Sequence, residues 1–350
     1  MEVNDILGLG KMLPIDKLID TISSATGRLS KSYFDKIDIN TKAYEIKRIA
    51  EARAEEMKII SQAVQNNFQL TGGIEYKETG IAISSPKDFS QDNRIINLTT
   101  SDLEERSKTR TDFKEAKRQL NIESVTSYAA ESLKNEPFVT DEPLDEDWKT
   151  RFFNIAEDIS NEEMQSLWGQ ILGGEIKQPK SYSLRTLELL KNLTKSEAEI
   201  FTKFAQLRLV AGDKSMIYNQ DDGKFLESEF GITFSDRLLL TELGLIASEN
   251  NLEFVYPETN QNRSKNILNY DNKGILLYRS ENTPKQAIQI LVFTKTGNEL
   301  SNLIQQVPNE EYMRKVCSSF KHQSVKIQYG DIVNYADGQV NLFNTVDYVD

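Results

Sequence analysis

The segment 147–210 carries the strongest helical pattern in this chain of 350 residues. Its apolar positions recur at i, i+3, i+4 and i+7, which is the spacing of one face of an α-helix. Residues 160–163 and 194–197 both read Ser/Thr-x-x-Glu, a capping box that satisfies unpaired amides at a helix N-terminus. Gly173 and Gly174 are expected to end the helix that follows the first box. Short helices with short connections predict a compact helical bundle. Its clearest apolar face consists of Met164, Leu167, Trp168, Ile171 and Leu172.

Residues 1–70 are expected to form an N-terminal arm of long helices. After Pro14, four apolar residues repeat at helical spacing and predict a short amphipathic helix. Two uses of that face stay open, namely packing on a partner helix in an oligomer and lying on a membrane surface. The first 60 residues contain ten acidic and ten basic residues, so no net charge attracts the arm to an anionic membrane. The candidate face consists of Ile15, Leu18, Ile19 and Ile22.

The segment 41–68 reads as one long helix within this arm. Small and branched apolar residues form a narrow stripe along it, and mixed charges cover the rest of its surface. This pattern is typical of a helix that packs on another helix, within or between subunits. The stripe is therefore a candidate protein-interaction surface. It consists of Ala43, Ile46, Ile49, Ala50 and Ala54.

A boundary is predicted near the middle of the chain. Residues 71–134 are expected to form an irregular or β insert followed by a helix. Residues 135–146 are expected to form an acidic linker, because they contain two prolines and many carboxylates. The stretch 135–163 contains ten acidic and two basic residues, so most of the chain's net charge of −12 lies near this boundary.

The pattern changes again from residue 211. A predicted helix at 235–248, three short strand candidates and a Thr-x-x-Gly-x-x-Leu helix start follow the order of a winged-helix domain. We therefore expect a winged-helix-like α+β module at 211–306 and a C-terminal extension with a short hairpin at 307–350. The fold class is accordingly predicted to be mainly α, with N-terminal long helices, a central bundle at 147–210 and this C-terminal module. The strand candidates are 252–256, 275–279 and 287–293.

The scarcity of two residue types limits the chemistry. Cys317 and His322 are the single cysteine and the single histidine, so no internal disulfide or closed Cys/His zinc site can form. Their spacing allows a nucleophile and its base, but a small buried residue and a surface histidine are the simpler interpretation. The acidic residues at 141–147 lack the glycine-centred loop of a calcium site. We expect no catalytic, cofactor-binding or metal-binding residues, and no cofactor.

Charge and hydropathy also bear on location. The acidic N-terminus lacks the basic and apolar regions of a signal peptide, and no apolar run approaches about 18 residues. A cytoplasmic protein is expected, peripheral at a membrane if the N-terminal face binds lipid. The acidic balance argues against broad contact with nucleic acid, because phosphate binding needs clustered Lys and Arg.

Several segments resemble a bacterial family of unknown function. The resemblance runs over roughly residues 40–305 and is carried by YEIKRIAEAR at 44–53, ISNEEMQSLWGQILGGE at 159–175, SLRT at 183–186 and SEAEIFT at 196–202. These segments are similar to the domain-of-unknown-function family 2806. The Met-x-x-Leu-Trp-x-x-Ile-Leu core is also similar to a motif of abortive-infection proteins, which implies a role in anti-phage defence. The resemblance supplies no catalytic residues.

Together these observations predict a non-enzymatic protein that acts by interaction or oligomerisation. It would serve as a sensor, adaptor or regulator in anti-phage defence. Its expected partners are a second copy of the chain and another bacterial protein encoded nearby. Two alternatives stay open: a membrane-acting effector that uses the N-terminal face, and a DNA-binding regulator that uses the predicted winged helix. A carboxylate-only or metal-dependent activity is also compatible with the sequence.

Overall fold

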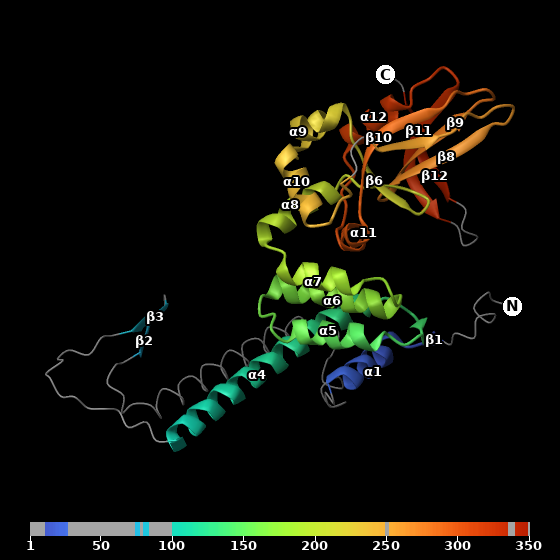
Figure 1. Ribbon diagram of the computed structural model, residues 1–350. Helices are drawn as coiled ribbons and strands as arrows, with labels where there is room; N and C mark the ends of the chain where they lie inside the picture. The colour runs from blue at the N-terminus through green and yellow to red at the C-terminus, as the bar shows by residue number, and fades with distance from the viewer. Residues whose placement is uncertain are drawn as a thin grey trace. The chain divides into compact units, whose positions relative to one another are not determined.

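The computed structural model describes residues 11–26, 74–77, 80–83, 100–248, 252–334 and 340–348 (Figure 1). They divide into two compact units, with the boundary between Lys180 and Ser181. We call the parts before and after this boundary unit 1 and unit 2. Among the helices described, none is both long enough and apolar enough to cross a membrane.

Unit 1 is helical, with two short antiparallel ribbons in its described part. One ribbon pairs β1 with β4, and the other pairs β2 with β3. The helices are α1 (Pro14–Thr26), α4 (Thr100–Leu133), α5 (Glu146–Ala156) and α6 (Glu162–Lys177), and the strands are β1 (Lys11–Met12), β2 (Ile74–Lys77), β3 (Gly80–Ile83) and β4 (Val139–Thr140).

Two glycines allow α4 and α6 to approach closely. A Cβ atom at Gly169 would lie 2.3 Å from the Cβ atom of Tyr128, and a Cβ atom at Gly173 would lie 1.9 Å from the hydroxyl of Ser132. Neither position has room for a side chain. Gly173 lies inside α6, because the helix continues to Lys177. The expectation that Gly173 ends the helix is wrong. The close approach of α4 explains why glycine stands at this position.

Aromatic side chains fill the core of unit 1. The Trp148 and Phe152 rings stack with their centroids 5.0 Å apart, and Phe152 lies 5.2 Å from the ring of Trp168. Both tryptophans and Phe152 are buried. The burial of Trp168 agrees with the apolar face predicted for residues 164–172.

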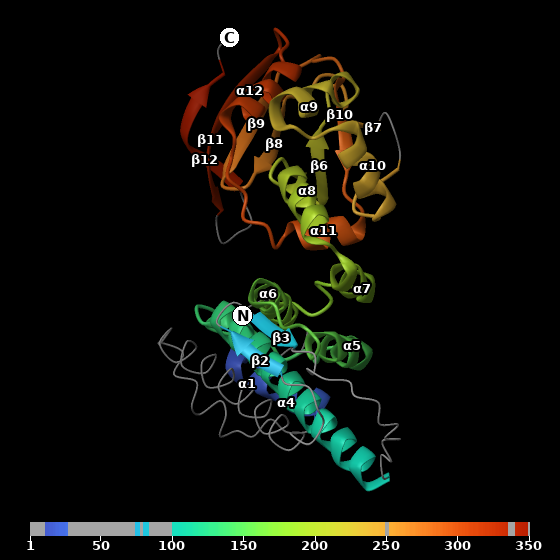
Figure 2. The ribbon, with the colours of Figure 1, turned by 90° about the vertical axis from the view of Figure 1, so that its left-hand side faces the viewer.

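Unit 2 combines helices with a large sheet. Its helices are α7 (Leu184–Asn192), α8 (Lys195–Ala205), the short 3₁₀ helix η2 (Asp221–Gly223), α9 (Lys224–Phe230), α10 (Phe234–Glu242), α11 (Lys295–Ser301) and α12 (Glu310–Ser319). Figures 1 and 2 show α8, α9 and α10 gathered on one side of the sheet, with α11 at one of its ends.

The sheet contains eight antiparallel strands in the order β12-β11-β9-β8-β5-β6-β10-β7. The middle of the sheet is formed by strands that follow one another in pairs, such as β5 with β6 and β8 with β9. The strands are β5 (Leu209–Ala211), β6 (Lys214–Tyr218), β7 (Leu252–Tyr256), β8 (Ser264–Tyr270), β9 (Lys273–Arg279), β10 (Gln286–Val292), β11 (Val325–Asn334) and β12 (Val340–Asp347).

This sheet overturns the predicted fold class. The protein is not mainly α, and its C-terminal half is not a winged helix, because an eight-stranded antiparallel sheet organises unit 2. The strand candidates at 252–256, 275–279 and 287–293 match β7, β9 and β10. The local pattern missed β5, β6 and β8, and it could not indicate that Val210 pairs with Asn269 across the sheet.

The helix predicted at 235–248 is also shorter than expected. It corresponds to α10, which ends at Glu242. Leu240 is fully buried, whereas Leu238 is 52% exposed. Gly244 adopts a positive φ of 69° just after the helix, a conformation that ends helices and favours glycine.

Candidate functional site

The predicted N-terminal face packs inside unit 1. Leu18 and Ile22 are fully buried, and Ile15 and Ile19 are half-buried. α1 contacts α4, α5 and α6. Insertion of this face into a membrane would therefore require α1 to leave unit 1. The structure gives the face an internal packing partner.

Polar contacts also hold α1 in place. The buried ammonium group of Lys17 donates to the carbonyl of Thr140 at 2.8 Å and to the carbonyl of Ile176 at 3.1 Å. It thereby joins α1 to β4 and to the C-terminal turn of α6. Lys149 of α5 donates to the hydroxyl of Ser24 at 2.9 Å.

The environment of Lys17 has opposing effects on its charge. Burial lowers the pKa of Lys17, because the charged form loses hydration. The carboxylates of Glu142, Asp141 and Glu175 oppose this shift. Glu175 is itself buried and accepts a hydrogen bond from the backbone of Lys180 at 2.6 Å. Lys17 and Glu175 therefore connect elements of unit 1, and their hydrogen bonds serve that structural role.

The second predicted surface cannot be placed in the same way. The stripe formed by Ala43, Ile46, Ile49, Ala50 and Ala54 lies outside the described residues. Its role stays a prediction from the sequence.

Cys317 is not an available nucleophile. The side chain is fully buried in α12, and burial raises the pKa of its thiol to about 12. His322 instead exchanges a hydrogen bond with the hydroxyl of Ser324 at 2.7 Å through its Nδ1 atom. In the part of the chain that is described, no three His, Cys, Asp or Glu side chains are grouped so that they could hold a metal ion.

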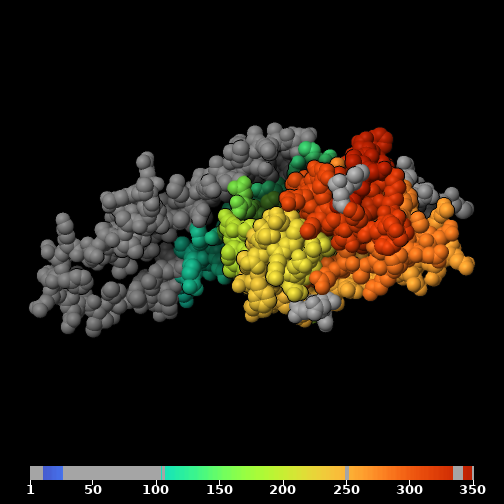
Figure 3. Space-filling model, turned by 90° about the horizontal axis from the view of Figure 1, so that it is seen from above, coloured from blue at the N-terminus to red at the C-terminus, as the bar shows by residue number. Residues whose placement is uncertain are grey.

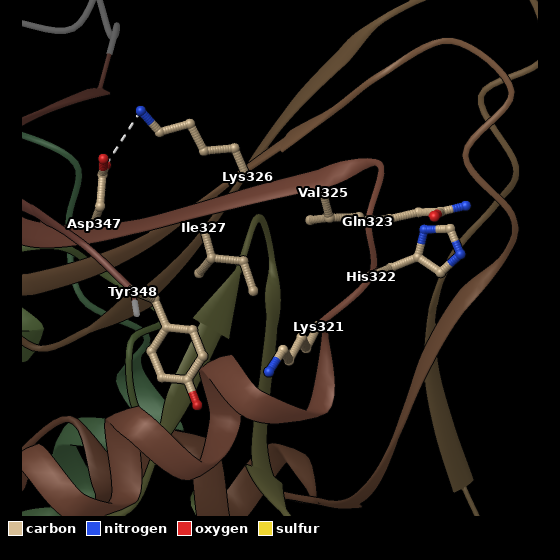
Figure 4. Close-up of a pocket in the computed structure, with 8 residues that line it drawn as sticks. All are labelled: Lys321, His322, Gln323, Val325, Lys326, Ile327, Asp347 and Tyr348. Atoms are coloured by element: carbon tan, nitrogen blue, oxygen red, sulfur yellow. Dashed lines mark ion pairs between the residues drawn. The ribbon is translucent and has the colours of Figure 1, made fainter. Parts of the chain in front are cut away.

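Figure 4 shows a hollow around His322, where the end of α12, the start of β11 and the end of β12 meet. Two of its charged groups are engaged with each other. Lys326 forms an ion pair with Asp347 at 3.2 Å, and Asp347 also accepts from the Gln328 amide at 2.6 Å. The hollow therefore offers few unused polar groups to a ligand. Its lining consists of Lys321, His322, Gln323, Val325, Lys326, Ile327, Asp347 and Tyr348.

A second hollow lies between β6, β10 and the start of α11, and we call it the α11 hollow. Apolar side chains from β6, β7 and β10 line its inner part, and polar side chains from the β5–β6 turn and α11 line its rim. The Lys214 ammonium group has no hydrogen-bond or ion-pair partner among the described residues. The Oδ1 atom of Asn298 is buried without a hydrogen-bond donor. This hollow therefore contains unused polar groups, including a cation.

The third candidate is a surface rather than a hollow. η2, α9 and α10 form the yellow area of the space-filling view (Figure 3). On α10, Phe234 and Leu238 are 66% and 52% exposed. The guanidinium carbon of Arg237 lies 5.8 Å from the centroid of the Phe234 ring. We call this the α10 surface.

The α10 surface was not predicted as a site. Phe234 and Leu238 are four residues apart, a spacing that a buried helix face and an exposed one share. In the structure, Leu240 faces the core of unit 2, and Phe234 and Leu238 are exposed to solvent.

These features define an α+β protein with a helical unit and an eight-stranded antiparallel sheet unit. The chain belongs to the family described as "Protein of unknown function (DUF2806)", which matches residues 105–317. The predicted family is thereby confirmed, whereas the similarity to abortive-infection proteins stays a prediction. The match includes the α10 surface and the α11 hollow but ends before the His322 hollow. No curated protein and no solved structure matches the chain.

Proposed function

We propose that this protein acts by binding another protein through the α10 surface, and not by catalysis. The exposure of Phe234 and Leu238 carries the proposal. They stand four residues apart, so their side chains share one face of the helix. A single exposed apolar residue is ordinary on a protein surface, but an adjacent aromatic and aliphatic pair is typical of an anchor that fills a pocket in a partner.

The charge around this pair favours a particular kind of partner. The segment 221–242 contains six acidic and two basic residues. One of the basic residues, Arg237, already donates to the carbonyls of Gly223 and Asp222. Two copies that met through this surface would bring like charges together, which is unfavourable. We therefore propose a different protein, with a basic and apolar helix or surface, as the partner.

The experiment compares three forms of the purified chain as bait in extract of the native bacterium. The test variant is Phe234→Ser with Leu238→Ser, and the control is Val307→Ser, another apolar residue that is 73% exposed in unit 2. Quantitative mass spectrometry should show proteins that are retained by the wild type and the control and lost from the double variant. The free energy of unfolding should change by no more than about 0.5 kcal/mol per substitution. Equal retention by the double variant would contradict the proposal.

Self-association is a separate proposal for the stripe at Ala43, Ile46, Ile49, Ala50 and Ala54. It is supported by the sequence pattern alone. Light scattering of the full chain should give more than one subunit per particle, and Ile46→Asp with Ile49→Asp should reduce this to one. The control Lys47→Glu changes the charged side of the same predicted helix. A monomeric wild type would rule out this role.

A role in anti-phage defence is supported by the resemblance of the Met-x-x-Leu-Trp-x-x-Ile-Leu core, residues 164–172, to a motif of abortive-infection proteins. The structure also gives part of this motif a packing role, because Trp168 is buried and Gly169 lies against α4. Plating of a phage panel on bacteria that express the chain tests the role. Protection by the wild type, lost in the α10 double variant, would support both proposals. Absence of protection by the wild type would count against defence alone.

A further inference from the structure

We propose that the α11 hollow binds a small apolar carboxylate that also carries a hydrogen-bond donor, the chemical class of apolar amino and hydroxy acids. The hollow has a volume of about 260 Å³, slightly below the usual range for drug-sized ligands. The ligand is therefore a small one. This site is separate from the α10 surface and does not depend on the function proposed for it.

The inner wall of the hollow is apolar. Met216 of β6, Phe254 of β7 and Val292 of β10 come from three neighbouring strands and line one side of it. Met216 is directly opposite Val292 in the β6–β10 pair, so their side chains lie on the same face of the sheet. An aliphatic or aromatic group of a ligand would pack on this wall and displace water from both apolar surfaces, which favours binding.

The cationic part of the rim suits a carboxylate. Lys214 follows the two-residue turn of Gly212 and Asp213, in which Gly212 has a φ of 63°. Its ammonium group is exposed and has no partner among the described residues. Lys295 enters from α11, and its ammonium group lies 3.8 Å from Glu299. A ligand carboxylate between these lysines would form charge-assisted hydrogen bonds, which are stronger than neutral ones.

Two acceptors of the hollow suit a donor on the ligand. Asn298 lines the hollow with a half-buried side chain whose Oδ1 atom has no hydrogen-bond donor. A buried acceptor without a partner costs free energy. Rotation of the Asn298 amide would bring its Oδ1 atom to an N–H or O–H group of the ligand. The hydrogen bond formed there would favour binding. The Asp213 carboxylate, which also has no partner among the described residues, provides a second acceptor at the rim.

Nuclear magnetic resonance of the full chain labelled with ¹³C-methyl methionine tests the site. The chain has six methionines, and Met216→Leu identifies the signal of Met216. We expect L-leucine or L-phenylalanine to move this signal in a saturable way. L-leucinol, which lacks the carboxylate, and octanoate, which lacks the donor, should each bind about tenfold more weakly, as expected for one lost charged or buried hydrogen bond.

Two substitutions should weaken binding of the amino acid, and one should not. Lys214→Gln and Asn298→Ala are each expected to raise the dissociation constant about tenfold. The control Lys203→Gln removes another exposed lysine of unit 2, on α8, and should leave it unchanged. Failure of both amino acids to move the Met216 signal would overturn the proposal. Equal effects of Lys214→Gln and Lys203→Gln would do so too, and octanoate binding as tightly as leucine would remove the role of Asn298.

Discussion

The carboxylate of Glu299 in α11 accepts a hydrogen bond from the backbone N–H of Ser183 at 2.7 Å. The same carboxylate oxygen accepts from the Ser183 hydroxyl at 3.0 Å and from the Thr186 hydroxyl at 2.5 Å. Ser183 is the N-cap residue of α7, but its own side chain makes no capping hydrogen bond to the helix backbone. A buried acid from a distant part of the sequence therefore fixes the start of α7 within unit 2.

Glu299→Ala should lower the stability of unit 2. The substitution leaves the donors of Ser183 and Thr186 without their acceptor, and we expect the free energy of unfolding to fall by about 1–3 kcal/mol. Urea unfolding followed by near-ultraviolet circular dichroism of the tyrosines measures it. The control is Glu310→Ala, because Glu310 is exposed on α12 and forms a surface ion pair with Arg314, worth about 0–1 kcal/mol. Equal losses in the two variants would contradict the capping role.

The helices of unit 1 follow from the sequence because their signals are local. The aromatic positions of α5 and α6 recur at helical spacing, and the buried residues Trp148, Phe152 and Trp168 confirm that pattern. The role of Gly173 could not be predicted in this way. A glycine is typical of a helix end, and only the approach of α4 explains its place inside α6.

Gly169→Ala tests the close contact of α4 with α6. Alanine has the higher helix propensity by about 1 kcal/mol, so an isolated helix would gain stability. In the protein, the new Cβ atom would meet Tyr128 at 2.3 Å, and we expect overpacking to lower the free energy of unfolding by about 1–3 kcal/mol. Tryptophan fluorescence during urea unfolding reports on unit 1, because Trp148 and Trp168 are the chain's two tryptophans. The control Gln170→Ala changes an exposed position on the same helix. A stabilised Gly169→Ala variant would contradict the contact.

The sheet of unit 2 was less accessible to prediction for a physical reason. Most residues of β9 are buried, so its sequence does not alternate between apolar and polar. The neighbouring β8 is polar in part and joins β9 through the two-residue turn at Asp271 and Asn272. This turn, with its positive φ of 53° at Asp271, was the signal that could have found the hairpin.

The candidate sites show the same limit. The sequence correctly placed Leu18 and Ile22 on one face of a helix, but periodicity does not indicate what covers a face. In the structure, α4, α5 and α6 contact α1 and cover that face. The polar groups of the α11 hollow come from segments about 80 residues apart in the chain and show no common motif.

Lys17→Met should loosen α1 from unit 1. Methionine keeps the apolar stem but leaves the carbonyls of Thr140 and Ile176 without the ammonium donor, at a cost of about 1–3 kcal/mol in the free energy of unfolding. Tryptophan fluorescence during urea unfolding checks the change. The control Asp20→Asn alters an exposed charge on the same helix and should have little effect. If Lys17→Met unfolds at the wild-type urea concentration, the two hydrogen bonds do not anchor α1.

Unit 2 should lose stability in alkaline solution, because burial raises the pKa of four of its tyrosines, namely Tyr218, Tyr256, Tyr270 and Tyr312. The pKa of Tyr256 rises to about 12 from an ordinary value of 10.0. Above pH 10 the unfolded chain therefore releases protons that the folded chain retains, so the free energy of unfolding falls as pH rises toward 12.

Absorbance at about 295 nm, where tyrosinate absorbs, should show these tyrosines ionising together with the loss of near-ultraviolet circular dichroism. Tyr256→Phe removes one such group and should reduce the slope of stability against pH. Ionisation of all the tyrosines near pH 10 in the folded chain would show that this cluster is open to water.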